Sequence, residues 1–341
     1  MHTLVAAIPT GFDPTLAHVV SQWPTERPVV CCRFDPKGRY VFCGLESSEV
    51  QRFDLADGKR APFSGGHESW VFSLAFSADG EKTFTGGGDG RITVWETASD
   101  SPHPVSKTEA HQGWIRTMSV TPNGLLLATG GNDRLVKIWD IATGSLVHEL
   151  KGHEGHIYSL EFHSNGESLL SGDLLGAIKQ WDLATGNLAA TFEAKALHSY
   201  NAGQQVDFGG VRALAITPDG KLVAAGGLHK ASNPLGAVHE PLVLLFEGES
   251  RKIVKTQLAD GITQGVIWRL RFLADGSLMG ACGGGKGGFL IFWKTDAEKD
   301  FHRFTLPNLL RDMDLHPDGL RVATAHYDRN VRITHLSAKA V

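Results

Sequence analysis

The order of apolar and polar stretches repeats seven times along the chain. Each repeat has an apolar stretch, a tight turn that ends in glycine, a second apolar stretch, a turn of small residues and a third apolar stretch. An Asp-Gly or Asn-Gly pair between two apolar stretches favours a β-hairpin, because both central positions of that turn need positive φ. Each repeat is therefore predicted to begin with a hairpin, whose turn ends at Gly38, Gly80, Gly124, Gly166, Gly220, Gly276 or Gly319.

The rest of each repeat predicts two further strands. In residues 91–95 and 136–140, β-branched and aromatic residues alternate with polar ones, which is typical of a half-buried strand. A more polar segment, such as residues 146–150, follows as a fourth strand. The turn glycines are 42, 44, 42, 54, 56 and 43 residues apart. A period of about forty residues with four strands is typical of a β-propeller blade.

These repeats predict a single all-β domain over residues 1–341, a seven-bladed β-propeller of four-stranded antiparallel blades. The last strand, residues 331–335, ends six residues before the C-terminus, which leaves no room for a fourth strand. Residues 16–23 precede the first inner strand at the offset of an outer strand, so we expect them to complete the last blade and close the ring. The blades are expected at approximately residues 28–65, 69–109, 113–151, 155–194, 210–259, 266–306, and 309–336 with 16–23.

The best-preserved repeats resemble the WD-repeat family, whose signature pairs Gly-His before the first strand with Trp-Asp at the end of the third. Gly66-His67 stands with Trp95-Glu96, Ala110-His111 with Trp139-Asp140, and Gly152-His153 with Trp181-Asp182. The resemblance implies a buried hydrogen-bonded tetrad of Asp, His, Ser or Thr, and Trp, which stabilises a blade and has no catalytic role. The implied structural residues are His67, Thr85, Asp89, Trp95, His111, Thr129, Asp133, Trp139, His153, Ser171 and Trp181.

The pattern is weaker in other repeats. The fourth repeat has Leu175 where the tetrad Asp is expected, and the seventh keeps Thr324 and Asp328 without the His or the Trp. Phe53, Phe246 and Thr334 replace the tryptophan in three repeats. We expect the fourth and seventh blades to be less stable than the second and third.

Two insertions, residues 193–210 and 228–240, lengthen the period. In alternating strands, the connection between strands two and three and the connection to the next blade open on one face, so the insertions must be neighbours there. We call this the top face. Long insertions on a rigid scaffold are disproportionately functional, and aromatic and arginine residues are enriched at binding hot spots. The predicted partner-binding residues of the top face are Trp70, Phe72, Trp114, Arg116, His156, Tyr158, Tyr200, Arg212, Lys230, Trp268 and Arg311.

Composition narrows the class of partner. With 33 basic and 37 acidic residues the net charge is −4, which gives little support to nucleic acid or an anionic membrane. The N-terminal stretch lacks the layout of a signal peptide, and no apolar run could span a bilayer. Four cysteines without metal-type spacing are expected to be reduced and buried, as in a cytoplasmic protein.

Catalytic motifs are weak in this sequence. Residues 280–286 fit the start of a phosphate loop, but Gly287 stands where Ser or Thr should bind magnesium, and a strand follows where a helix is needed. No hydrolase or metalloenzyme motif is present, so neither a catalytic role nor a cofactor is expected. The alternative is a small-molecule or metal site, possibly enzymatic, built from His198, Asp207, His229, His239 and Glu240.

The sequence therefore predicts a protein–protein interaction scaffold. The resemblance to the WD-repeat family implies that the top face binds a peptide, loop or domain of another protein, and a fold alone does not name that partner. We expect a cytoplasmic, monomeric propeller that works within a complex.

Overall fold

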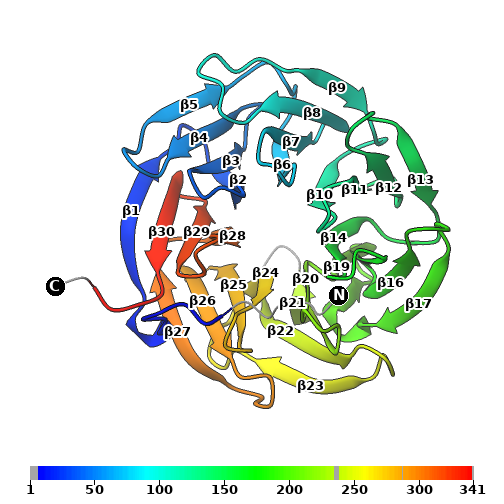
Figure 1. Ribbon diagram of the computed structural model, residues 1–341. Helices are drawn as coiled ribbons and strands as arrows, with labels where there is room; N and C mark the ends of the chain where they lie inside the picture. The colour runs from blue at the N-terminus through cyan, green and yellow to red at the C-terminus, as the bar shows by residue number, and fades with distance from the viewer. Residues whose placement is uncertain (1–6, 234–237, 286, 340–341) are drawn as a thin grey trace. The chain divides into compact units, whose positions relative to one another are not determined.

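The computed structural model describes residues 7–233, 238–285 and 287–339. Over these residues the regular elements are β-strands, together with two short 3-10 helices, η1 (Pro14–Leu16) and η2 (Lys195–Leu197). The strands form seven four-stranded antiparallel sheets and one two-stranded hairpin (Figure 1). The all-β fold of seven four-stranded propeller blades is thereby confirmed. None of the helices in the described part is long and apolar enough to cross a membrane.

The chain divides into two compact units, and each is described by itself. The four-blade unit contains Leu16–Gly152 and the chain from Arg311 onward. It holds blades 7, 1, 2 and 3. The three-blade unit contains His153–Leu310 and holds blades 4, 5 and 6.

The first three blades lie consecutively in the four-blade unit. Blade 1 consists of β2 (Val29–Phe34), β3 (Tyr40–Leu45), β4 (Val50–Asp54) and β5 (Arg60–Phe63). Blade 2 consists of β6 (Val71–Phe76), β7 (Lys82–Gly87), β8 (Arg91–Glu96) and β9 (Ser106–Glu109). Blade 3 consists of β10 (Ile115–Val120), β11 (Leu126–Gly131), β12 (Val136–Asp140) and β13 (Leu146–Leu150).

The three-blade unit has the same sheets with the insertions added. Blade 4 consists of β14 (Ile157–Phe162), β15 (Ser168–Asp173), β16 (Ala177–Asp182) and β17 (Leu188–Glu193). Blade 5 consists of β20 (Ala213–Ile216), β21 (Leu222–Asn233), β22 (Val238–Glu247) and β23 (Ile253–Leu258). Blade 6 consists of β24 (Gly265–Phe272), β25 (Leu278–Gly284), β26 (Gly287–Trp293) and β27 (Asp300–Leu306). The extra hairpin is β18 (His198–Asn201) with β19 (Val206–Gly209).

Blade 7 takes its outer strand from the other end of the chain. Its strands are β28 (Leu310–Leu315), β29 (Arg321–His326) and β30 (Asn330–His335), and β1 (His18–Pro24) pairs antiparallel with β30. Figure 1 shows β1, in dark blue, beside β30, in red. The Trp23 ring stacks on Phe53 of blade 1 with centres 5.4 Å apart. The N-terminal segment therefore completes the last blade, as the repeat pattern predicts.

The hairpins are confirmed, but their turn type differs from the expected one. All seven predicted turn glycines have positive φ, between 66° at Gly38 and 77° at Gly276. The residue before each of them does not, so only one central position needs the left-handed conformation. In blade 2 the N–H of Gly80 donates to the carbonyl of Ser77 at 2.9 Å, and the Asp79 carboxylate accepts from the Ser77 hydroxyl. A single positive φ at the glycine fits a type I turn that is closed by a left-handed glycine. The aspartate stabilises this turn through its side chain.

The cysteines are free and buried, as the sequence predicts. Burial raises the pKa of the Cys31 thiol and of the Cys282 thiol to about 12. A thiol with such a high pKa is rarely a thiolate at neutral pH and is therefore a poor nucleophile. These side chains belong to the apolar cores between blades.

Candidate functional site

A chain of hydrogen bonds crosses blade 2 and links the four residues that the family resemblance implies. The indole N–H of Trp95 donates to the Thr85 hydroxyl at 3.0 Å, and the Thr85 hydroxyl lies 2.7 Å from Nε2 of His67. Nδ1 of His67 lies 3.2 Å from the Asp89 carboxylate. We assign the threonine O–H as donor to Nε2 and the Nδ1–H as donor to Asp89, which satisfies every group in turn.

Blade 3 contains the same chain. Trp139 donates to Thr129 at 3.0 Å, His111 Nε2 lies 2.7 Å from Thr129, and His111 Nδ1 lies 2.9 Å from Asp133. Burial raises the pKa of Asp89 in blade 2, yet the hydrogen bonds from His67 and from the backbone N–H groups of Glu68 and Arg91 together outweigh it and lower that pKa to about 2. The tetrad histidines are occupied on both ring nitrogens, so they have no free nitrogen for catalysis.

Blade 4 corrects the sequence prediction that its tetrad lacks an acid. Trp181 donates to Ser171 at 2.7 Å, and His153 Nε2 lies 2.7 Å from the same hydroxyl. His153 Nδ1 lies 2.7 Å from Asp173. Asp173 is therefore the acid of this tetrad, in place of the acid expected at position 175, which is Leu175. The tetrad of blade 4 is therefore complete, and this reason for expecting a less stable blade 4 is wrong.

The exchange has a steric explanation. The positions of Asp173 in blades 2 and 3 are Gly87 and Gly131, where a Cβ atom would lie within 2.4 to 2.5 Å of the tetrad histidine Nδ1. A side chain at that position therefore points directly at Nδ1. In blade 4 it is an aspartate, and it makes the hydrogen bond from there.

Blade 7 uses the same position differently. His326 stands where Asp173 stands in blade 4, and its Nε2 lies 2.9 Å from the hydroxyl of Thr324. Arg332 forms an ion pair with Asp328 at 2.6 Å and donates from Nε to Gln22 of β1 at 2.9 Å. The absence of the usual His and Trp is thus offset by other polar contacts, one of which secures the outer strand.

Four predicted partner-binding residues form one stack on the four-blade unit. Phe72 and Trp114 lie parallel with ring centres 4.7 Å apart, Trp70 lies 6.1 Å from Phe72, and the Arg116 guanidinium lies 4.8 Å over Trp114. Trp70 is 42% exposed and Trp114 is 39% exposed, whereas Trp95 in the tetrad is 0% exposed. We call Trp70, Phe72, Trp114 and Arg116 the tryptophan stack. It presents a rigid aromatic surface to solvent.

Arg311, also in the four-blade unit, belongs to a second arginine–aromatic contact. Its guanidinium lies 4.7 Å over the Tyr327 ring and donates to the carboxylate of Glu46 at 2.5 Å. Neither partner was predicted from the sequence. Glu46 and Tyr327 each come directly after the second strand of their blade. Asn132 has the same place in blade 3, and its side-chain oxygen accepts a hydrogen bond from Arg116. Aligning the residue after the second strand in all seven repeats could have identified Glu46 and Tyr327 from the sequence.

Three predicted residues of the three-blade unit form a clamp around an arginine. The Arg212 guanidinium lies 3.8 Å from the centre of the Tyr158 ring and 5.7 Å from that of Trp268. Its Nε donates to the carbonyl of Gly209 at 2.6 Å. These side chains come from blades 4, 5 and 6, and all three are half-buried. We call Tyr158, Arg212 and Trp268 the arginine clamp.

The two insertions lie side by side, as expected, and the first contains the β18–β19 hairpin. The β18–β19 hairpin contacts β21, whose upper part is the second insertion. Tyr200 is 56% exposed, and Lys230 forms an ion pair with Glu240 at 2.9 Å. His156 is half-buried, and its carbonyl accepts from the N–H of Leu174 at 2.9 Å.

The alternative metal site is not supported. Four of its five residues form two separate pairs, His198 with Asp207 at 2.8 Å and His229 with Glu240 at 3.5 Å. Across residues 7–233, 238–285 and 287–339, no group of three His, Cys, Asp or Glu side chains is placed to bind a metal ion. Burial lowers the pKa of His239 and of His229, which favours their neutral forms.

The glycine-rich segment is a β-hairpin. Residues 280–284 belong to β25 and residues 287–293 to β26, so a strand follows the loop where a nucleotide site needs a helix. Lys286 lies outside the residues that the structure describes.

Comparison with known proteins finds similarity in three of the repeats. Residues 61–96, 102–140 and 144–182 match the model of the WD domain, G-beta repeat, and each match ends on the Trp-Glu or Trp-Asp pair of a blade. Over 66 residues the chain is 32% identical to U3 small nucleolar RNA-associated protein 12 of Saccharomyces cerevisiae. That match covers 19% of this chain and 7% of the yeast protein, so the chain spans a small part of its relative. Three repeats of this chain match the WD40 repeat model, which is consistent with a WD-repeat family.

Proposed function

We propose that this protein is an interaction scaffold that binds a peptide, loop or domain of another protein through its arginine–aromatic surfaces. The observation that carries the proposal is the tryptophan stack. Solvent-exposed tryptophans that are held rigid by a neighbouring ring lose little entropy on binding, and Trp, Tyr and Arg are enriched among hot-spot residues. WD40 propellers are typically protein-interaction scaffolds, which supports the same role.

The arginine clamp of the three-blade unit offers a partner a hydrogen-bond donor as well as aromatic surface. The indole N–H of Trp268 is shielded from solvent and has no hydrogen-bond partner among the described residues. A buried N–H without an acceptor is costly, so a bound segment whose carbonyl reaches this N–H, after a small shift of the clamp, would remove that cost. We propose no catalytic role for either surface, because the guanidinium groups of Arg116 and Arg212 already lie on aromatic rings and donate to oxygen acceptors of the chain.

We do not extend the RNA association in the yeast relative's name to this chain. The similarity covers 66 residues, and the net charge of this chain is −4. Neutralising phosphates requires clustered Lys and Arg, and the surfaces described above carry single arginines. Protein partners therefore remain the proposal.

Affinity capture with matched variants tests the function. A variant with Trp70→Ala and Trp114→Ala should lose at least one stoichiometric protein partner that the wild type captures. A control variant with Leu125→Ala and Leu146→Ala removes two side chains that are 62% and 45% exposed elsewhere on the same unit, and it should keep that partner. Equal capture by wild type and both variants would contradict the assignment of the tryptophan stack.

A further inference from the structure

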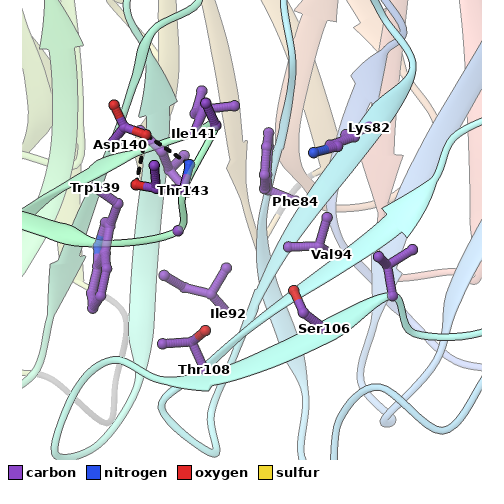
Figure 2. Close-up of a pocket in the computed structure, with 14 residues that line it drawn as sticks. Lys82, Phe84, Ile92, Val94, Ser106, Thr108, Trp139, Asp140, Ile141 and Thr143 are labelled. Atoms are coloured by element: carbon purple, nitrogen blue, oxygen red, sulfur yellow. Dashed lines mark hydrogen bonds between the residues drawn. The ribbon is translucent and has the colours of Figure 1, made fainter.

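A pocket of 160 Å³ lies between blade 2 and blade 3 of the four-blade unit (Figure 2). Its walls are Phe84, Ile92 and Val94 of blade 2 and the indole of Trp139 of blade 3. The turn after β12, residues 140–144, forms the rim. That turn is at the opposite end of blade 3 from Trp114, since β12 runs away from the end at which β10 begins. The pocket is therefore separate from the tryptophan stack.

The register of the outer strands shows which side chain covers the tetrad aromatic residue of the following blade. In blade 1, Phe63 of β5 pairs with Val50, and its ring lies 5.5 Å from Trp95 of blade 2. In blade 4, Phe192 pairs with Ile178 and lies 5.7 Å from Phe246 of blade 5. An aromatic ring of one outer strand thus covers the aromatic residue of the following blade.

Blade 7 follows the same rule. Trp23 pairs with Val331, and its ring stacks at 5.4 Å on Phe53 of blade 1. The following aromatic residue in all these cases stands at the tetrad tryptophan position. An aromatic side chain from the outer strand is therefore a recurrent part of the contact between consecutive blades.

An aromatic residue does not stand at this register in every blade. Blade 3 has Leu150 there and blade 5 has Gln257, yet the tryptophans of the following blades, Trp181 and Trp293, are only 2% and 0% exposed.

In blade 2 the space is left open. The residue that pairs with Ile92, at the register of Phe63, is Thr108, and the following tetrad residue is Trp139. Thr108 has no ring to cover the indole, and the space is the pocket that both residues line. Trp139 is accordingly 8% exposed, while Trp95, covered by Phe63, is 0% exposed.

We propose that this pocket binds an aromatic side chain from a segment of a partner protein. The chain's own rings fill the equivalent places in blades 1, 4 and 7, so the geometry of the contact already suits a phenyl group. The volume of 160 Å³ is also sufficient, since a cavity of about 150 Å³ lined by apolar side chains binds benzene. The bound ring would lie against Trp139 as Phe63 lies against Trp95.

The charge at the rim points to an acidic residue next to that aromatic one. Lys82 lines the pocket and is exposed, and no carboxylate of the described residues lies within 4.0 Å of its ammonium group. Asp140 is the acidic residue of the rim, and its carboxylate accepts from the N–H and hydroxyl of Thr143 at 2.7 and 2.8 Å. Figure 2 shows Lys82 and Asp140 on opposite sides of Phe84. A carboxylate on the partner would therefore lie on the Lys82 side.

Small peptides of matched composition test the proposal on the full chain. The probe is N-acetyl-Asp-Phe amide, with N-acetyl-Asp-Ala amide and N-acetyl-Asn-Phe amide as controls, and binding is followed by NMR titration. We expect the alanine control not to bind, and the asparagine control to bind several-fold more weakly than the probe. Nuclear Overhauser contacts should join the phenyl protons to the Trp139 indole and the Val94 methyl groups. Binding that does not require the phenyl group would overturn the proposal.

Two variants locate the binding site. Thr108→Phe copies the arrangement of Phe63 and should weaken the probe at least tenfold, while Thr108→Ser should bind it like the wild type. Lys82→Glu should remove the preference for Asp over Asn. Unchanged binding in Thr108→Phe would refute the pocket as the site, and contacts to Trp139 in the wild type decide the question if that variant does not fold. Binding of benzene without any binding of the peptides would also refute it, because the pocket would then admit only free small molecules.

Discussion

The Arg212 guanidinium lies 3.8 Å from the centre of the Tyr158 ring, on the adjacent blade. It also faces Trp268 of the following blade at 5.7 Å and donates to the Gly209 carbonyl at 2.6 Å. An arginine that joins three blades stabilises the unit in which it lies. Loss of partner binding after its removal is therefore informative only when the stability of the variant is measured as well.

We predict that Arg212→Lys destabilises the protein although it keeps the charge. A lysine ammonium cannot lie flat on Tyr158, so the variant loses about 1 to 2 kcal/mol of partly desolvated cation–π interaction. Arg251→Lys, in an exposed turn of the same unit, is the matched control and should leave the free energy of unfolding unchanged. Urea denaturation measures both. Equal stability of Arg212→Lys and wild type would show that the clamp contributes nothing to folding.

The tetrad of blade 4 gives a second prediction. Asp173→Gly leaves the buried Nδ1–H of His153 without an acceptor and should cost about 1 to 3 kcal/mol. The double variant Asp173→Gly with Leu175→Asp recreates the arrangement of blades 2 and 3, where glycine and aspartate stand at these two positions. It should recover most of the lost stability. A double variant no more stable than Asp173→Gly alone would show that the two positions are not equivalent.

The tetrad aspartates also predict how stability depends on pH. Burial raises the pKa values of Asp89 and Asp173, but hydrogen bonds from the tetrad histidines and from backbone N–H groups together hold them below the ordinary value of 3.8, at about 2 for Asp89. An aspartate with a lowered pKa stabilises the folded state above its unfolded pKa, and this stabilisation is lost as the pH falls toward the folded pKa. The free energy of unfolding should therefore decrease between about pH 4 and about pH 2.

Variants identify the groups responsible for this pH dependence. Asp89→Asn should show a smaller decrease over the same range than the wild type, because the titrating group is gone. Asp57→Asn, at an exposed turn, should decrease like the wild type. Denaturation curves at several pH values measure the slopes. Parallel slopes for wild type and Asp89→Asn would contradict the role of this carboxylate.

The fold could be predicted because its information is local and repeated. A turn glycine at a period of about forty residues and alternating strands specify a blade, and seven copies make the assignment independent of any one of them. The sequence alone did not show that Asp173 supplies the tetrad acid that position 175 lacks. The position of Asp173 is glycine in the repeats of blades 2 and 3, and a glycine position does not suggest an acid. Only the geometry around His153 shows that both positions reach the same nitrogen.

The surfaces were harder to predict than the blades. Arg311 was identified from its place at the start of an inner strand, but its partner Glu46 is 265 residues away in the chain. The pocket beside Trp139 was not predicted at all. It depends on the register of Thr108 against Ile92, and the irregular spacing between third and fourth strands hides that register in the sequence. Contacts between blades therefore require the structure, while contacts within a blade follow from the repeat.

The last prediction concerns the strand that β1 contributes to blade 7. Deleting residues 1–24 removes Trp23 from Phe53 and Gln22 from Arg332, and it leaves the outer edge of β30 unpaired. An unpaired edge strand is a template for association with another chain, so we expect a lower melting temperature and dimers or aggregates in light scattering. Deleting residues 1–15 keeps β1 and should leave the protein monomeric. A synthetic peptide of residues 16–24 should bind the longer deletion and raise its melting temperature by mass action on the native state. A monomeric 25–341 protein with the melting temperature of the wild type would show that β1 is dispensable for the last blade.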